Sequence, residues 1–164
     1  MALVRSYVSL GLREAGIRLI GTGDTDESFL PAIGDAALGM VTAYHYSSSL
    51  DTPENRRYVE AYRRRFGNDA VINFASVAGY VGMQAIADAV RRLCPNFSGD
   101  QAMEALKGWR ANSPKGPVSI DAAERDIVQN IYIRRVERAG GGLANIAFET
   151  VPNVGDIWKR YNPN

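Results

Sequence analysis

The sequence is poor in the two residue types that most often carry catalysis or bind metal ions. Its 164 residues include one cysteine, Cys94, and one histidine, His45. A single cysteine cannot form an intrachain disulfide, and no base lies near it in the sequence, so we expect Cys94 to be structural. Neither charge sign is in excess, since 19 basic and 18 acidic residues leave a formal net charge of +1. Such a chain has no positive field for phosphates, and we expect no nucleic-acid partner.

Sequence motifs that carry catalysis are also absent. The sequence contains no nucleophile elbow, zinc motif or phosphate loop. A hydrolase that used His45 with Asp24 or Asp35 would depend on one histidine whose partners the sequence does not place beside it, which is not a catalytic set. The acidic segment 121–126 lacks the glycine and glutamate spacing of a calcium loop. We therefore expect a protein that is not an enzyme and that needs no cofactor or metal ion.

Long apolar segments are missing as well. No uncharged run is long enough to cross a bilayer. Arg5 and Arg13 interrupt the apolar residues near the N-terminus, which predicts an amphipathic helix over 2–15 that ends at Gly16. A signal peptide needs an unbroken apolar stretch, so we expect none in this chain. Apolar residues make up 46% and charged residues 23%, which is ordinary for a globular domain.

The first third of the sequence predicts short elements. We expect a buried strand, a glycine-containing turn, a short helix and a second strand rich in β-branched and aromatic residues, over 17–20, 21–24, 26–38 and 40–46.

Helical signals follow the second strand. Thr52-Pro53 is an N-cap followed by proline at the first helical position, and Gly67 ends that helix. Its cluster Arg63–Arg65 is expected to be a solvated helix face. A long helix over 74–93 and a third over 98–107 follow. The long helix has small residues that are expected to let it pack closely on a sheet, namely Ala75, Ala78, Gly79, Gly82, Ala85 and Ala89.

After residue 115 the apolar residues alternate, which is typical of strands. We expect strands over 117–120, 127–136 and 143–151, the last two joined as a hairpin by Gly140–Gly142, and a final helical turn over 156–161. Helix and strand alternation followed by a hairpin predicts an α/β fold with three layers and a mixed sheet.

Four stretches, in this order and spacing, resemble one family. They are GIRLIGTGD at 16–24, GDAALGMVTAYHYS at 34–47, NRRYVEAYRRRFG with AGYVGM at 55–67 and 78–83, and SPKGPVSID with RDIVQNIYIR at 113–121 and 125–134. Together they look like the second half of the leucine/isoleucine/valine-type periplasmic solute-binding proteins of branched-chain amino-acid ABC transporters. The resemblance implies two α/β lobes that close on a ligand.

The chain is far shorter than that family, so the resemblance implies an incomplete type I periplasmic-binding-protein fold with a C-terminal β-hairpin. It implies that 1–42 is the tail of lobe two, 43–125 the second half of lobe one with crossing strands, and 126–164 the return to lobe two. The serine/threonine loop that usually holds the ligand carboxylate would lie in the absent half.

Five residues are candidates for ligand contact. Asp24 follows a strand, where open α/β sheets place ligands, and relatives often pair an acidic residue here with a ligand ammonium group. Asp24 and Thr22 equally suit a plain turn. His45 and Tyr46 lie on the predicted crossing strand and face opposite sides, so one of them is expected to line the cleft. His45 also suits a structural role. Phe74 is either an aromatic residue bordering the cleft or a core residue.

The resemblance implies a small-molecule ligand, an amino acid or an aromatic or aliphatic carboxylate, and an ABC permease as the partner of the full-length protein in the periplasm. A ligand-sensing regulatory domain of the same fold, and a truncated gene product without a transport role, are the alternatives. Because the absent strands would leave apolar faces and sheet edges exposed, we also expect a homodimer or higher oligomer.

Overall fold

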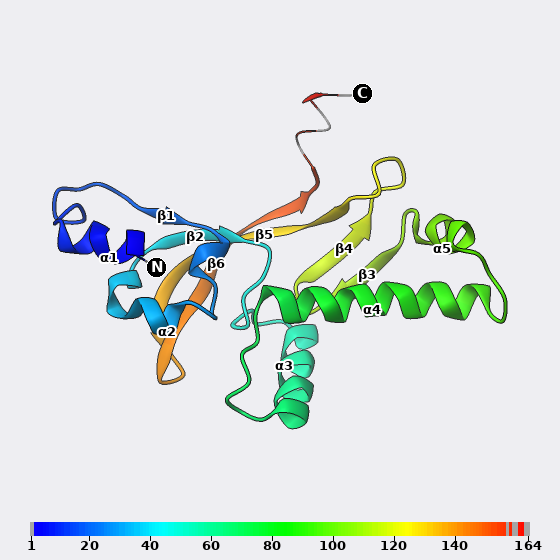
Figure 1. Cartoon of the computed structure of the whole chain (residues 1–164), viewed down its shortest axis with the longest axis horizontal. Helices are drawn as coiled ribbons and strands as arrows, with labels where there is room; N and C mark the ends of the chain where they lie inside the picture. The colour runs from blue at the N-terminus through cyan, green and yellow to red at the C-terminus, as the bar shows by residue number, and fades with distance from the viewer. Residues whose placement is uncertain (1, 157, 159–160, 163–164) are drawn as a thin grey trace.

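The computed structural model describes residues 2–156, 158 and 161–162 (Figure 1). Its elements are α1 (Ala2–Ser9), β1 (Ile20–Gly21), η1 (Gly23–Thr25), α2 (Leu30–Ile33), η2 (Gly34–Ala37), β2 (Val41–Tyr44), α3 (Pro53–Phe66), α4 (Phe74–Leu93), α5 (Gly99–Leu106), β3 (Arg110–Ser113), β4 (Gly116–Ile120), β5 (Ile127–Ala139) and β6 (Gly142–Val154). In Figure 1, α1 and α2 lie with β1 at one end of the molecule, and α3–α5 lie with β3 and β4 at the other.

One sheet runs through the molecule in the order β1-β2-β5-β4-β3, and β6 pairs with β5 off that path. β1 and β2 are parallel, and the other pairs are antiparallel. The long strand β5 pairs with β4 at Ile127 and with β2 at Tyr132, so it belongs to both ends of the molecule. The predicted mixed α/β sheet with a C-terminal hairpin is confirmed.

The buried apolar residues form two clusters. Core one holds α3 and α4 against the sheet and contains Tyr46, Leu50, Tyr58, Ile72, Val77, Val81, Ala85, Trp109, Val118 and Tyr132. Core two lies beneath α1 and α2 and contains Val4, Leu30, Ile33, Ala37, Met40 and Val136. Because β5 supplies Tyr132 to core one and Val136 to core two, this strand links the two cores.

The helices of core one begin where capping residues predict. The Thr52 hydroxyl accepts from the Asn55 backbone N–H at 3.1 Å, and Gly67, with φ +94°, closes α3. Asn73 and Ser76 form a capping box at the start of α4, and Ser98 with Gln101 forms another at α5. Each box satisfies backbone N–H groups that have no partner within the helix, which is why local sequence predicted these starts.

The prediction of how α4 packs was wrong in part. α4 packs on the sheet, but its buried face consists of Val77, Val81, Ala85 and Ala89. Most of the small residues, including Gly79 and Gly82, are exposed, and a Cβ added at either glycine would meet nothing within 4 Å. Val77 and Val81 share the buried face with two of the predicted small residues, Ala85 and Ala89, and the other four lie on the exposed side.

Several predictions for the first third were also wrong. α1 ends at Ser9 instead of continuing to 15, and Gly11 then has φ +66°, in the left-handed region that breaks a helix. The strand predicted over 17–20 is only Ile20–Gly21, and Ile17 and Ile20 are 53% and 69% exposed. The helix predicted over 26–38 is divided at Gly34, which has φ +70°.

Two further differences concern the C-terminal half. β3 was not predicted because Arg110–Ser113 has no apolar alternation, and it forms by pairing with β4 beside the buried Trp109. The helical turn predicted over 156–161 falls partly outside the described residues.

Candidate functional site

The candidate site forms where the parallel strands β1 and β2 end on the same edge of the sheet. β1 leads into the turn that contains Thr22 and Asp24, and β2 ends at Tyr44, directly before His45. Gly23 lies so close to Tyr44 that an added Cβ would be 2.9 Å from its ring. A larger residue at position 23 would therefore displace the Tyr44 ring.

An aromatic cluster of Tyr44, His45 and Phe74 occupies this edge. The Tyr44 ring centroid is 4.4 Å from that of His45 and 5.4 Å from that of Phe74, and the His45 and Phe74 centroids are 6.3 Å apart. All three side chains are partly buried. The structure thus brings together two predicted site residues that are 29 positions apart in the sequence.

Hydrogen bonds fix the start of α4 against the segment that follows η1. The Asn73 side-chain amide donates to the Ser28 hydroxyl at 2.7 Å, and the Phe74 backbone N–H donates to Asp26 Oδ2 at 3.4 Å. Asp26 Oδ1 accepts from both the backbone N–H and the hydroxyl of Ser28, at 3.0 and 2.7 Å. Asp26 therefore holds Phe74 next to the strand ends.

Asp24 and Thr22 are exposed on the turn beside this cluster. Asp24 Oδ1 accepts from the backbone N–H of Thr22 at 2.9 Å and from its hydroxyl at 3.4 Å. These hydrogen bonds are those of an aspartate that closes its own turn, which agrees with the interpretation of Thr22 and Asp24 as plain turn residues.

Tyr46 lies elsewhere. Its side chain is fully buried in core one, and its hydroxyl donates to Asn55 Oδ1 at 2.9 Å. His45 and Tyr46 do face different surroundings, as expected. Tyr44 is only partly buried and lies outside core one, because β2 ends at Tyr44 and the chain then turns.

Behind the cluster, a seam of buried polar residues separates the two cores. It consists of Thr25, Thr42, Ser47, Arg134 and Asn145, all with no more than 1% of their surface exposed. Thr42 donates to Asn145 Oδ1 at 2.9 Å, and the Asn145 amide donates to the carbonyl of Thr25 at 2.9 Å. The seam ties β2 and β6 to the end of η1.

Arg134 is the charge at the centre of this seam. Its Nε donates to Thr42 Oγ1 at 3.1 Å and its Nη1 donates to the Tyr46 carbonyl, and the guanidinium carbon lies 5.6 Å from the Tyr44 ring centroid. Burial lowers the pKa of Arg134, and the nearby carboxylates of Glu27 and Asp26 act in the opposite direction. Alternation on β5 predicted the strand, but not a buried arginine beside the site.

Glu27 faces the seam through Ser47. The Ser47 hydroxyl lies 2.8 Å from Glu27 Oε1 and 2.6 Å from the carbonyl of Asn145. One hydroxyl has one proton to donate, so both contacts are satisfied when a protonated Glu27 donates to Ser47 and Ser47 donates to Asn145. Burial raises the pKa of Glu27 to about 7, which agrees with this arrangement.

His45 is the neutral member of the site. Burial, together with the positive charges of Lys115 and Arg134, lowers its pKa to about 4. At neutral pH the imidazole is therefore uncharged, with one ring nitrogen as donor and the other as acceptor. It can hydrogen-bond a ligand hydroxyl or carboxylate without carrying charge.

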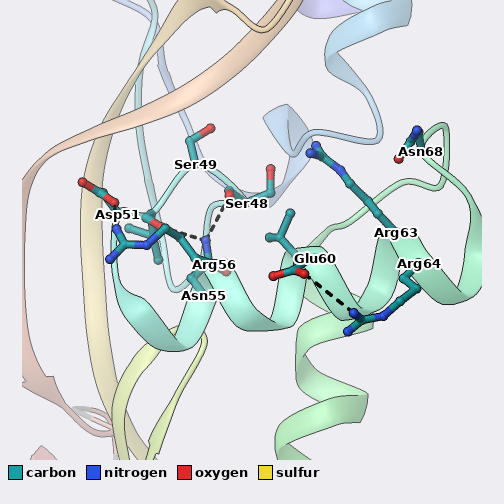
Figure 2. A pocket seen from close by; sticks show the side chains of 11 residues that line it. Ser48, Ser49, Asp51, Asn55, Arg56, Glu60, Arg63, Arg64 and Asn68 are labelled. Atoms are coloured by element: carbon teal, nitrogen blue, oxygen red, sulfur yellow. Dashed lines mark hydrogen bonds and ion pairs between the residues drawn. The ribbon is translucent and has the colours of Figure 1, made fainter.

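A separate concavity lies against α3 (Figure 2). It has a volume of about 630 Å³ and shares no lining residue with the aromatic cluster. Charged side chains line much of it, with Arg56 paired to Asp51 and Arg64 to Glu60 at 3.7 Å. These exposed pairs leave the surface solvated, as expected for the arginine cluster, although Arg63 and Arg64 border the hollow. Within the described part of the chain, no three potential metal ligands gather, and no helix there is long and apolar enough to cross a membrane.

Comparison with known proteins defines the class. The model of the family described as periplasmic binding protein matches residues 1–142. The chain belongs to this family, as its sequence resemblance implied.

Particular relatives are similar over nearly the whole chain. The Leu/Ile/Val-binding protein homolog 6 of Brucella suis is 43% identical over 158 residues, which are 95% of this chain and 40% of that protein. A solute-binding protein of an ABC transporter from Rhodopseudomonas palustris BisB5, solved with 3,4-dihydroxybenzoic acid, is 41% identical with a TM-score of 0.85 over 95% of this chain and 43% of its own. Another solute-binding protein, from Rhodopseudomonas palustris HaA2 and solved with p-hydroxybenzoic acid, is 37% identical with a TM-score of 0.83. The match covers 92% of this chain and 41% of that one. The chain thus spans about two fifths of the length of these relatives.

Proposed function

We propose that this chain is part of a solute-binding protein of an ABC importer and that the aromatic cluster contacts a small aromatic carboxylate. The observation that carries the proposal is the joining of Tyr44, His45 and Phe74 at the ends of two parallel strands. Open α/β folds bind ligands at such ends, and aromatic rings favour offset or edge contacts with another ring. The two Rhodopseudomonas proteins were solved with hydroxybenzoic acids, which supports this ligand class.

The proposed role is binding without catalysis. The sequence contains a single histidine, and its ring packs against the rings of Tyr44 and Phe74. In the proposed whole protein, the region of core two belongs to lobe two and the region of core one belongs to lobe one. The two lobes close on the ligand. The periplasm is its proposed location, and an ABC permease is its proposed partner.

Branched-chain amino acids are the second candidate ligands. The exposed carboxylate of Asp24 beside the cluster favours them, since an acidic side chain can pair with a ligand ammonium group. The aromatic carboxylate is preferred because the cluster offers three ring surfaces, whereas Asp24 already accepts two hydrogen bonds within its turn.

Titration of the ¹⁵N-labelled chain with 4-hydroxybenzoate and, separately, with leucine tests the proposal. We expect 4-hydroxybenzoate to shift amide signals of the strand ends and of the start of α4, with binding weaker than micromolar because a single chain supplies only part of the contacts. The variant Phe74→Ala should weaken binding several-fold, and Phe97→Ala, which removes an aromatic ring remote from the cluster in sequence, serves as the control. If only leucine shifts these signals, the ligand class is the amino acids and not the aromatic carboxylates. If neither ligand shifts them, the aromatic cluster is not a binding site.

A further inference from the structure

Two buried polar atoms at the seam have no hydrogen-bond partner. They are Oε2 of Glu27 and Nη2 of Arg134, and neither finds a partner in the described part of the chain. The first is a carboxyl oxygen, which accepts hydrogen bonds, and the second carries N–H groups, which donate them. No ion pair within the described residues joins the two side chains. Because unpaired buried polar groups destabilise a fold, these two atoms point to a second arrangement in which they meet.

Glu27 and Arg134 contact two adjacent residues of the chain. Arg134 Nη1 donates to the carbonyl of Tyr46, and the hydroxyl of Ser47, the next residue, lies 2.8 Å from Glu27 Oε1. The opposite charges of the two side chains also act on one another. Glu27 and Arg134 are therefore neighbours, and a rotation of the Glu27 carboxyl group is the movement that would join Oε2 to Nη2.

The proton on Glu27 decides which partner this side chain takes. While Glu27 is protonated, it donates to Ser47, and Ser47 donates to the carbonyl of Asn145 at 2.6 Å. When the proton leaves to solvent, the carboxylate can only accept, so the single proton of Ser47 no longer serves both contacts. The negative charge then favours a charge-assisted hydrogen bond from Arg134. Burial raises the pKa of Glu27 to about 7, which places this exchange near neutral pH.

Two charged groups among the described residues act on Glu27. Asp26, on the same segment, opposes its ionisation, and Arg134, on β5, favours it. The other groups in contact with Glu27 are neutral, namely the Ser47 hydroxyl of the segment after β2 and, beyond it, the Asn145 carbonyl of β6. Arg134 is therefore the cation that faces an ionised Glu27.

Ser47 fixes one end of the segment that joins the two regions. This segment, 47–50, leads from β2 to α3. Its α3 end is held by Asn55, whose amide donates to the carbonyls of Ser48 and Leu50 at 3.0 and 2.8 Å. At its other end, the Ser47 hydroxyl accepts from the Ser49 N–H and the Ser47 carbonyl accepts from the Leu50 N–H, both at 3.2 Å. A change of partner at Ser47 therefore loosens the segment from the side of β2.

We propose that Glu27 is a proton-dependent switch, which bonds Ser47 when it is protonated and pairs with Arg134 when it is ionised. The exchange releases the Ser47 end of segment 47–50, so that the regions of core one and core two move more freely against one another above neutral pH. The two arrangements differ by one proton and one side-chain rotation, and protonation can control a two-state element of this kind. The inference goes beyond the proposed function and needs no ligand.

Amide hydrogen exchange of the ¹⁵N-labelled chain at pH 5.5 and 7.5 tests the switch, with each rate divided by the intrinsic rate at that pH. We expect the protection of Ser49 and Leu50 to fall about five- to tenfold at pH 7.5, the effect of losing one hydrogen bond in the segment. The Nη–H signals of Arg134 should become more protected over the same range. Glu27→Gln should keep the protonated arrangement at both pH values, because glutamine can donate at every pH. Glu149→Gln, at an exposed position, is the matched control and should respond as the wild type does.

Equal protection of Ser49 and Leu50 at the two pH values in the wild type overturns the proposal, and so does a response that persists in Glu27→Gln. A ¹³C titration of the Glu27 carboxyl group supplies a test that needs no variant, because its midpoint must coincide with that of the Arg134 signals. Different midpoints overturn the pairing even where Glu27→Gln does not fold. These outcomes leave the aromatic cluster untouched, since ligand titration tests it separately.

Discussion

Core one and core two are built in different ways. Core one packs two long capped helices, of 14 and 20 residues, against the sheet. Core two is assembled from an eight-residue helix, a four-residue helix and single-turn segments. Short helices gain little from local hydrogen bonds and depend on packing. The region of core two therefore owes its structure to tertiary contacts. The region of core one is supported by tertiary contacts and by the local hydrogen bonds of its long helices.

The buried seam lies where the two regions meet. β5 places Tyr132 in core one, Val136 in core two and Arg134 between them. The candidate site lies at the edge of this junction, so ligand contacts and the connection of the two regions share residues. The difference between the regions can be tested by perturbing each one separately.

The largest effect is expected on assembly. Tyr80, Met83 and Ile86 of α4 are 51%, 61% and 50% exposed, and exposed apolar residues at this spacing along one helix favour association. We expect a homodimer, seen as a doubled mass in sedimentation over a dilution series, that Met83→Glu together with Ile86→Glu converts to monomer. A single monomer mass for the wild type at high concentration would refute it.

Truncating core one should have the largest effect on stability. Trp109 is 3% exposed, and its indole N–H donates to Asp88 Oδ2 at 3.1 Å. Trp109→Ala should lower the free energy of unfolding by about 3–5 kcal/mol through the cavity it leaves. Urea denaturation measures this loss, and Trp158→Ala, at a 73% exposed position, should change little. Equal effects of the two substitutions would contradict the assignment of core one.

Truncating core two should act locally. Leu30 is fully buried, and Leu30→Ala should cost about 2–4 kcal/mol. Because this region depends on packing, amide hydrogen exchange should rise in α1 and α2 much more than in α4. Uniformly faster exchange in both regions would show that core one and core two unfold as one unit and are not supported in different ways.

The seam should make stability depend on pH through Glu27. The folded-state pKa of Glu27, about 7, lies above its ordinary value of 4.5. The protonated Glu27 therefore adds to the free energy of unfolding in full below pH 4.5, and this stabilisation is lost as pH rises through 7. His45, with a folded pKa near 4, acts with the opposite sign between pH 6.5 and 4, so the measurement is made in His45→Gln. Raising pH from 5.5 to 8 should cost about 2 kcal/mol in urea denaturation.

Adding Glu27→Gln to that background should remove this dependence, since glutamine can donate to Ser47 at every pH. A pH dependence that persists in the double variant would place the responsible proton elsewhere.

The smallest effect is expected at the capping box of α5. Ser98 accepts from the Gln101 backbone N–H at 3.2 Å, and Ser98→Ala should cost about 1 kcal/mol. α5 contributes no fully buried residue, so the loss should be seen in exchange from α5 more than in global unfolding. Ser98→Asn, which keeps a capping oxygen, should restore most of the stability.

The sequence by itself determined the α/β class, the helices α3, α4 and α5, the hairpin and the family, because caps, glycines and alternation act between neighbours in the chain. It also indicated Asp24, His45 and Phe74 as candidates. Only the tertiary structure decided that Tyr44 joins His45 and Phe74 while Tyr46 is buried, because β2 ends one residue before His45. The burial of Glu27, Lys115 and Arg134 was likewise beyond sequence, since charged residues are usually exposed and these are enclosed by segments far away in the chain.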